Sequence, residues 1–277
     1  MERRAKPSPA VVLLRNERFC SGEAEMSGKQ VFLAGAVAAA LLCASQTQAQ
    51  DYAFQGFATA DAMNQMHAAM RDNMMESSSD ARSPSRGGVA AGAAASERRA
   101  AATGRTTYQS SPAVTQRVKR QFADFVRSTG GDGPGIAAAM EQQDFFARWG
   151  RHVAQYGLRR GDVADAMTAY WMLNWQIAND VRTVSRSQVQ GVQAQVRNIM
   201  GSNPAFSGLN NAQKQEMAEV LILNFIAQSV AYEDAMRDND VAMQRRLQNA
   251  ATTRFRNEMN VNLRQLRLGG SGFTAAS

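Results

Sequence analysis

Apolar residues recur at helical spacing through most of the second half of the chain. In the segment 136–156, for example, four of them stand at i, i+4, i+8 and i+11: Phe145, Trp149, Val153 and Tyr156. No segment offers a convincing set of alternating strand residues. The pattern predicts an all-α fold, a single helical bundle of about five to six helices. We expect them at 113–129, 136–156 (one helix or two), 163–178, 189–200, from Asn210 past Tyr232, and at about 240–260.

The segment 163–178 is expected to be the central helix, because nearly every direction around it is apolar. Asp162 is placed to cap this helix, and Asp165 lies in its first turn. Both carboxylates would there face exposed amides and the positive end of the helix dipole. Gly157 suits the left-handed position that often ends a helix, here the preceding one.

The main domain is expected to span 113–268, with a flexible tail at 269–277. Asn210 and Gln213 resemble a capping box at the start of the long fifth helix. The closing stretch 261–273 looks extended, as a segment lying across the bundle would be.

The N-terminal region contains a pattern typical of secretory signal peptides. After Met26 come a basic residue, an apolar run at 31–44, a polar stretch and small residues that end at Ala49. The apolar run has 14 residues, fewer than the ~20 that a membrane helix requires. We therefore expect residues 1–49 to be removed during export, with Met26 as the true start. The expected location is the periplasm or outside the cell, and no transmembrane segment is expected in the mature chain.

Composition narrows the possible chemistry. Both cysteines, Cys20 and Cys43, fall in the expected leader, so the mature chain would lack disulfides and thiolate ligands. After Ala49 there are 25 Lys and Arg against 20 Asp and Glu, and 23 of the 25 are Arg. The excess looks spread along the chain and no nucleic-acid motif appears. We expect no nucleic-acid partner; an envelope protein or an anionic envelope surface is favoured.

Residues 76–112 are almost entirely Ser, Ala, Gly and Arg, and we interpret them as a disordered linker. Its length argues that the segments on either side do not form one compact unit. The preceding segment 50–75 is predicted to form a short amphipathic helix with one stripe of soft metal-ligand side chains: Met63, Met66, His67, Met70 and Met74. Thioethers with imidazole favour Cu(I) or Ag(I), but methionine stripes usually serve packing. Both interpretations stay open.

Two stretches resemble a family of exported bacterial proteins classed as a domain of unknown function. The features that carry the resemblance are Tyr156-Gly157-Leu158, Asp162 through Ala166, Tyr170-Trp171, Trp175, Pro204-Ala205-Phe206, Asn210 through Glu219 and the closing LRLGGSGF. The resemblance covers about 113–275. It implies a signal peptide, a variable low-complexity stretch and a helical domain, and it carries over no catalytic residue and no cofactor.

The aromatic cluster has two interpretations: Trp149, Tyr156, Tyr170, Trp171 and Trp175 could line a ligand pocket or fill the core. Their helical spacing among aliphatic residues favours the core. Asp162 and Asp165 could be a catalytic pair, but capping accounts for both. Arg159 and Arg160 are expected in solvent or paired with those acids.

Isolated polar residues give weaker signals. His152 is the only histidine of the domain, so a triad or metal site would lack partners of the usual type. Asn174, Asn224 and Gln228 each lie within an apolar helix. We hypothesise that Asn174 bonds to Asn224 or Gln228, since buried amides need partners. The alternative is that each sits at the edge of its apolar stripe.

These observations do not identify an activity. We favour a non-enzymatic interaction or structural module of the cell envelope. The first alternative is soft-metal binding through the stripe at 63–75, and the second is a hydrolase of envelope polymers. The hydrolase is least favoured because no nucleophile and base are arranged together.

Overall fold

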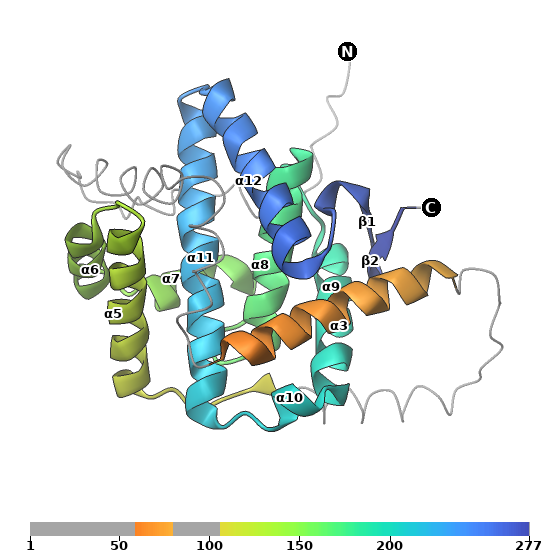
Figure 1. Ribbon diagram of the computed structural model, residues 1–277, viewed down its shortest axis with the longest axis horizontal. Coiled ribbons are helices and arrows are strands. Elements are labelled where there is room, and N and C mark those ends of the chain that lie inside the picture. The colour runs from red at the N-terminus through yellow and green to blue at the C-terminus, as the bar shows by residue number, and fades with distance from the viewer. Residues whose placement is uncertain (1–58, 80–105, 277) are drawn as a thin grey trace, which may run out of the picture.

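The computed structural model describes residues 59–79 and 106–276, and within them it is mostly helical (Figure 1). The expected leader 1–49 and most of the expected linker lie outside the described residues. The elements, in chain order, are α3 (Ala60–Ser79), α5 (Pro112–Ser128), α6 (Gly133–Gln142), α7 (Phe145–Ala154), α8 (Val163–Asn179), α9 (Arg186–Ser202), α10 (Pro204–Ser207), α11 (Asn211–Arg237), α12 (Val241–Met259), the 3-10 turn η1 (Leu263–Gln265), β1 (Leu266–Gly269) and β2 (Gly272–Ala275).

The all-α prediction is confirmed, but the described residues hold nine helices rather than five to six. The difference has local causes. Asp144 caps a new helix by accepting a hydrogen bond from the amide of Ala147, so 136–156 divides into α6 and α7. Asn203 starts the single turn α10 in the same way, through the amide of Ala205. None of these helices is long and apolar enough to cross a lipid bilayer.

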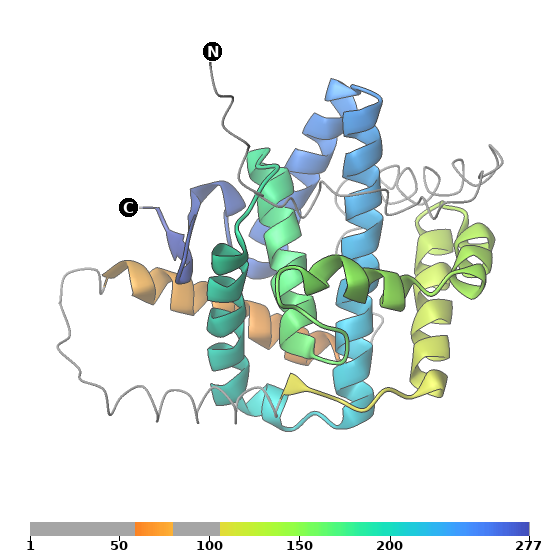
Figure 2. The same ribbon diagram turned by 180° about the vertical axis from the view of Figure 1, so that it is seen from behind.

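Helices α8 and α11 form the centre of the bundle. Nearly all of α8 is buried, as predicted, and so is α11 from Gln215 to Tyr232. Helix α9 packs against α8, α5 and α7 pack against α11, and α12 packs against both central helices. Figure 2, viewed from behind, shows α7 lying across α11, between α8 on one side and α5 with α6 on the other. The central pair runs in the same direction, since Asp180 at the end of α8 accepts a hydrogen bond from Tyr232 in the last third of α11, and the other helices surround this pair (Figure 1).

The helix starts agree with the capping signals. Asp162 accepts from the amide of Ala164, as expected for a cap. Asn210 and Gln213 form the predicted capping box, each side chain accepting from the other's amide over 3.0 Å. Gly157 has a φ of +84° at the end of the turn after α7, the left-handed conformation predicted for it.

The C-terminal segment differs from the expected flexible tail. Residues 266–275 form an antiparallel hairpin in which Leu268 pairs with Phe273. Phe273 is buried against Trp171 and Trp175, with ring centroids 6.3 and 5.9 Å away. Burial of this one large ring and backbone pairing across the hairpin together account for the order of the segment.

The methionine-rich helix α3 also differs from expectation, because it is packed on the bundle. It lies across α9 and contacts α10, α12 and strand β2 (Figure 1). The structure therefore contradicts the expectation that the segments flanking the linker form separate units. The expectation rested on the composition and length of the linker. The packing of α3 on the bundle depends instead on the buried side chains of α3.

Candidate functional site

The most concentrated group of charges in the core lies where α8 begins. Asp162 and Asp165 are both almost fully buried, and one guanidinium joins them. Arg197, from α9, donates from Nη2 to Asp162 Oδ2 over 3.0 Å and to Asp165 Oδ1 over 2.8 Å. Gln193 donates to the same Asp165 oxygen over 2.6 Å, and the amide of Arg159 donates to the other over 2.9 Å. Every carboxylate oxygen of this pair therefore has a partner within the protein.

The pKa of Asp165 is raised to about 6, first by burial and second by the negative charge of Asp162. The guanidinium of Arg197 and the hydrogen bonds from Gln193 and the Arg159 amide oppose this rise. A carboxyl group with a pKa near neutrality is a common feature of acid–base catalysts. Here both of its oxygens already accept hydrogen bonds from fixed neighbours, so the geometry is that of a structural ion cluster.

The far end of the expected linker covers this ion cluster. Thr107 forms an isolated antiparallel bridge with Asp162, and the Tyr108 amide donates to the Gly161 carbonyl over 3.1 Å. The Tyr108 ring is buried, and burial raises the pKa of its hydroxyl. Residues 106–111, which the composition placed in a disordered segment, are thus a packed part of the domain.

A second buried polar group lies nearby, between α5 and α11. Glu219 accepts from the Thr115 hydroxyl over 2.8 Å and from the Gln215 amide over 3.0 Å. Glu216 accepts from Arg117 over 2.7 Å. Burial raises the pKa of Glu219. These contacts fasten the entry of α5 to α11, so these carboxylates also hold helices together.

The sequence analysis missed Arg197, Gln193, Glu216 and Glu219. Glu216 and Glu219 carried a usable signal, because acids that precede a long apolar helical run need buried partners if the helix is central. Arg197 and Gln193 carried none, since they stand at polar positions of an ordinary amphipathic helix. Arg159 and Arg160 were expected in solvent or paired with these acids; Arg159 lies 3.5 Å from Asp162, whereas Arg160 pairs with Asp144 at 3.6 Å.

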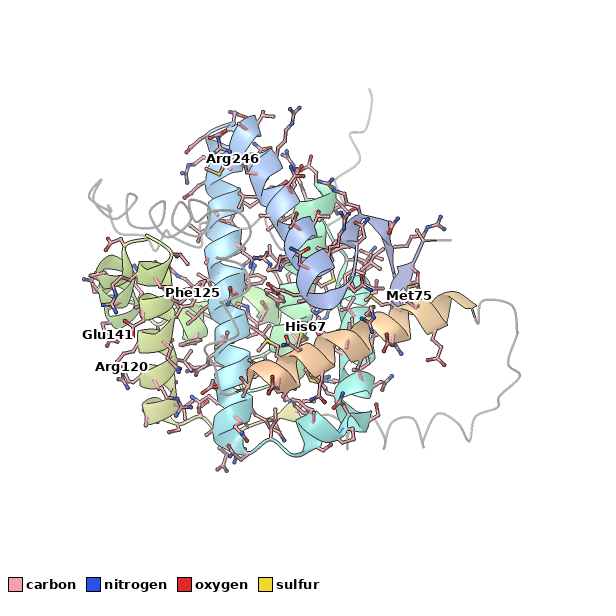
Figure 3. The ribbon with its side chains drawn as sticks, in the orientation of Figure 1. His67, Met75, Arg120, Phe125, Glu141 and Arg246 are labelled. Carbon is pink, nitrogen blue, oxygen red and sulfur yellow. The ribbon has the colours of Figure 1, made fainter. Side chains whose placement is uncertain are left out.

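The predicted metal-ligand stripe faces the bundle. Its five side chains are at most 2% exposed: Met63, Met66, His67, Met70 and Met74. The indole of Trp171 donates to Nδ1 of His67 over 3.1 Å, and Figure 3 shows His67 directed from α3 toward the helices beneath it. Burial lowers the pKa of His67 to about 3, so the ring is neutral at physiological pH. The lone pair that a soft metal would use is engaged by this indole.

Two further hydrogen bonds fix α3. Gln195, on α9, donates to Asn73 of α3 over 2.9 Å, and it also exchanges two hydrogen bonds with the backbone of Phe273. Thr59, just before α3, donates to Glu216 over 3.4 Å. Gln195 thereby joins three segments that are far apart in the sequence.

The aromatic side chains fill the core, as predicted. Trp149, Tyr156, Tyr170 and Trp171 are fully buried, and Trp171 meets Phe255 edge to face with centroids 4.9 Å apart. Trp175 is half-buried and donates to the Leu266 carbonyl over 3.1 Å, which fastens the C-terminal hairpin. Tyr170 stacks on Phe255 with ring centroids 5.7 Å apart, and both Tyr170 and Trp171 contact the ring of His67.

Asn174 and His152, two isolated polar residues singled out in the sequence, both contact other side chains of the domain. Asn174 donates to the Tyr170 carbonyl one turn earlier and accepts from Arg254 of α12 over 2.6 Å. The hypothesis that it bonds to Asn224 or Gln228 is wrong, because its amide group bonds to the Tyr170 carbonyl and to Arg254, while Asn224 donates to the Val220 carbonyl. His152 lies 6.1 Å from the ring of Phe225. Within 59–79 and 106–276, no three His, Cys, Asp or Glu side chains gather as a metal site would require.

A family model described as a family of unknown function, DUF6683, matches residues 29–276. The chain belongs to this family. No curated protein and no solved structure matches it significantly.

Proposed function

We propose that the protein is a non-enzymatic interaction module of the bacterial cell envelope, exported by the leader that ends at Ala49. One observation carries the proposal: the best candidates for chemistry, Asp162 and Asp165, have every oxygen engaged by α8, Arg197, Gln193 and the Arg159 amide. A catalytic carboxylate needs an oxygen directed at a substrate. Because the buried carboxylates hold helices together and leave no oxygen for a substrate, the domain is suited to binding a partner through its surface.

The two alternatives have less support. Soft-metal binding through Met63, Met66, His67, Met70 and Met74 would require ions to enter a packed interface and displace the Trp171 indole from His67. Hydrolysis of envelope polymers would require a freed carboxyl pair at the start of α8. Both stay alternatives to the interaction module.

The export step is tested by cell fractionation and N-terminal sequencing of the accumulated protein. We expect a chain that begins at Gln50 and co-fractionates with periplasmic markers. Recovery of the intact N-terminus in the cytoplasm would contradict export.

The non-enzymatic role is tested by two parallel measurements on the purified protein. The first is capture from envelope fractions, followed by binding of the recovered component in isolation. The second is incubation with purified envelope polysaccharide and peptidoglycan, with soluble fragments measured. We expect saturable binding and no fragment release. Release of fragments that disappears in Asp165→Asn, while the variant still melts cooperatively, would establish the hydrolase instead.

A further inference from the structure

The excess of basic over acidic residues lies in the last segment of the chain, residues 241–276. Residues 106–240 hold 13 Lys and Arg against 13 Asp and Glu, whereas 241–276 hold six Arg and one Glu. The segment 50–105 is also balanced, with six of each sign. The expectation that the excess is spread along the chain is therefore wrong. The whole net charge of +5 after Ala49 belongs to α12, η1 and the hairpin.

The structure places several of these arginines on the outer side of α12. Arg245, Arg246 and Arg256 are exposed and share the outward stripe of the helix with Asn249 and Thr253. No acid lies on that stripe. With a rise of 1.5 Å per residue, Arg245 and Arg256 stand roughly 16 Å apart along the helix. The stripe is thus an elongated cationic strip on a convex surface.

A fourth arginine joins the strip from the side. Arg264 of η1 donates to Asn249 over 3.2 Å and to the Ala178 carbonyl over 3.1 Å, which holds its exposed guanidinium over the middle of α12. By contrast, Arg254 is directed inward to Asn174.

Ion pairs within the described part of the chain leave these surface arginines out. None of Arg245, Arg246, Arg256 and Arg264 forms an ion pair with a residue in the described ranges. The ion pairs there involve other basic residues: Arg71, Arg117, Lys119, Arg127, Arg159, Arg160, Arg197 and Arg237. Three acids of this region are engaged elsewhere: Asp180 accepts from Tyr232, Asp240 caps α12, and Glu258, the one acid within α12, is half-buried and interacts electrostatically with Tyr170. The positive charge of the strip is therefore not neutralised by ion pairs within the described residues and is available to an external anion.

One apolar feature accompanies the strip. Val241, four residues before Arg245 and on the same side of α12, is 54% exposed, and only Met75 is comparably exposed among the large apolar side chains described. Guanidinium groups bind phosphate through paired hydrogen bonds. A convex row of arginines with an exposed apolar residue suits a flat layer of phosphate headgroups better than it suits a polymer that must be enclosed.

We propose that the outward face of α12, with Arg245, Arg246, Arg256 and Arg264, binds the phosphate headgroups of an anionic lipid surface. This inference rests on the proposed interaction function and names the class of partner. The neutral remainder of the domain then faces away from the membrane. Figure 3 shows Arg246 at the upper end of α12, well away from Arg120 on α5.

The test is sedimentation with vesicles of phosphatidylglycerol and phosphatidylcholine in equal parts, compared with vesicles of phosphatidylcholine alone. The protein is the form that accumulates in cells expressing the full chain. The triple variant Arg245→Gln, Arg246→Gln, Arg256→Gln removes three charges of the strip. Its matched control, Arg120→Gln, Arg127→Gln, Arg151→Gln, removes three exposed charges from α5 and α7. Melting curves establish that both variants fold.

We expect binding to the anionic vesicles that salt weakens, a loss of about a hundredfold in the strip variant, and little change in the control. Equal losses in the two variants would mean that net charge alone drives binding and would overturn the proposal. Absence of vesicle binding would also overturn it, as would preference for duplex DNA or for lipid-free phosphorylated polysaccharide over the vesicles. If the folded strip variant, with its three arginines replaced, still captures a protein partner, the proposed interaction function stands and this inference is overturned.

Discussion

The indole Nε1 of Trp171 donates a hydrogen bond to Nδ1 of His67 over 3.1 Å, between two buried side chains that are 104 residues apart in the sequence. An imidazole that accepts at Nδ1 carries its proton on Nε2. The bond thus fixes the neutral tautomer of His67 and fastens α3 to the central helix α8.

Replacing Trp171 by Phe removes the indole donor and leaves His67 buried without it. We expect a loss of about 1–3 kcal/mol in the free energy of unfolding, measured by urea denaturation. Trp149→Phe is the matched control, because Trp149 is as deeply buried but its Nε1 donates to no described residue. Equal losses in the two variants would show that ring volume, and not the hydrogen bond, determines the result.

Acid should weaken the docking of α3 through His67. The pKa of His67 is about 3 in the folded protein and 6.5 in a model peptide, so the unfolded chain binds a proton first as pH falls. The contribution of a neutral His67 is complete above pH 6.5 and decreases below it. Relative to His67→Asn, which cannot titrate, the wild-type protein should lose about 2 kcal/mol between pH 7 and 5. A difference that stays constant with pH would contradict this.

Removing Arg197 should leave two buried carboxylates without their shared counter-ion. Arg197→Met is expected to cost about 3–5 kcal/mol in urea denaturation at pH 8, whereas Arg127→Met, which breaks an exposed pair with Asp124, should cost about 1 kcal/mol or less. The pKa of Asp165 is already about 6, and loss of the guanidinium raises it further. The cost should therefore be smaller at pH 5 than at pH 8. A cost that grows on acidification would be inconsistent with the ion cluster.

Gly191 is the point where the hairpin meets α9. A Cβ there would come within 2.6 Å of the Gly272 amide nitrogen, so Gly191→Ala must move backbone and is expected to destabilise the protein by about 1–3 kcal/mol. Gly150→Ala in α7 is the control, since its Cβ would meet only Arg160 Cβ at 3.6 Å. That change should be neutral or add up to about 1 kcal/mol, as expected for alanine within a helix. A neutral Gly191→Ala would indicate that the hairpin is not seated on α9.

The sequence predicted those features that depend on neighbouring residues. The caps at Asp162 and Asn210 and the left-handed Gly157 follow from the chemistry of a few adjacent positions, and all three are confirmed. The burial of Trp171 follows in the same way from the apolar surroundings within α8.

The features that were missed depend on contacts between distant segments. The pairing of Arg197 with Asp165 spans 32 residues, and the contact of Gln195 with Asn73 spans 122. Polar residues such as these look alike on a helix, whether they face solvent or a buried partner. The order of the C-terminal hairpin was missed for the same reason, and the packing of the α3 methionines remained one of two open interpretations.

The position of α3 has a consequence for the integrity of the fold. Because Met63, Met66, Met70 and Met74 belong to the same core as Trp171, a single cut of the backbone between residues 80 and 105 would not by itself divide the folded body. The two fragments would stay associated through the buried methionines and the hydrogen bonds of α3, as two subunits of a heterodimer do. They would separate only when the larger fragment unfolded or a competing amphipathic helix replaced the smaller one.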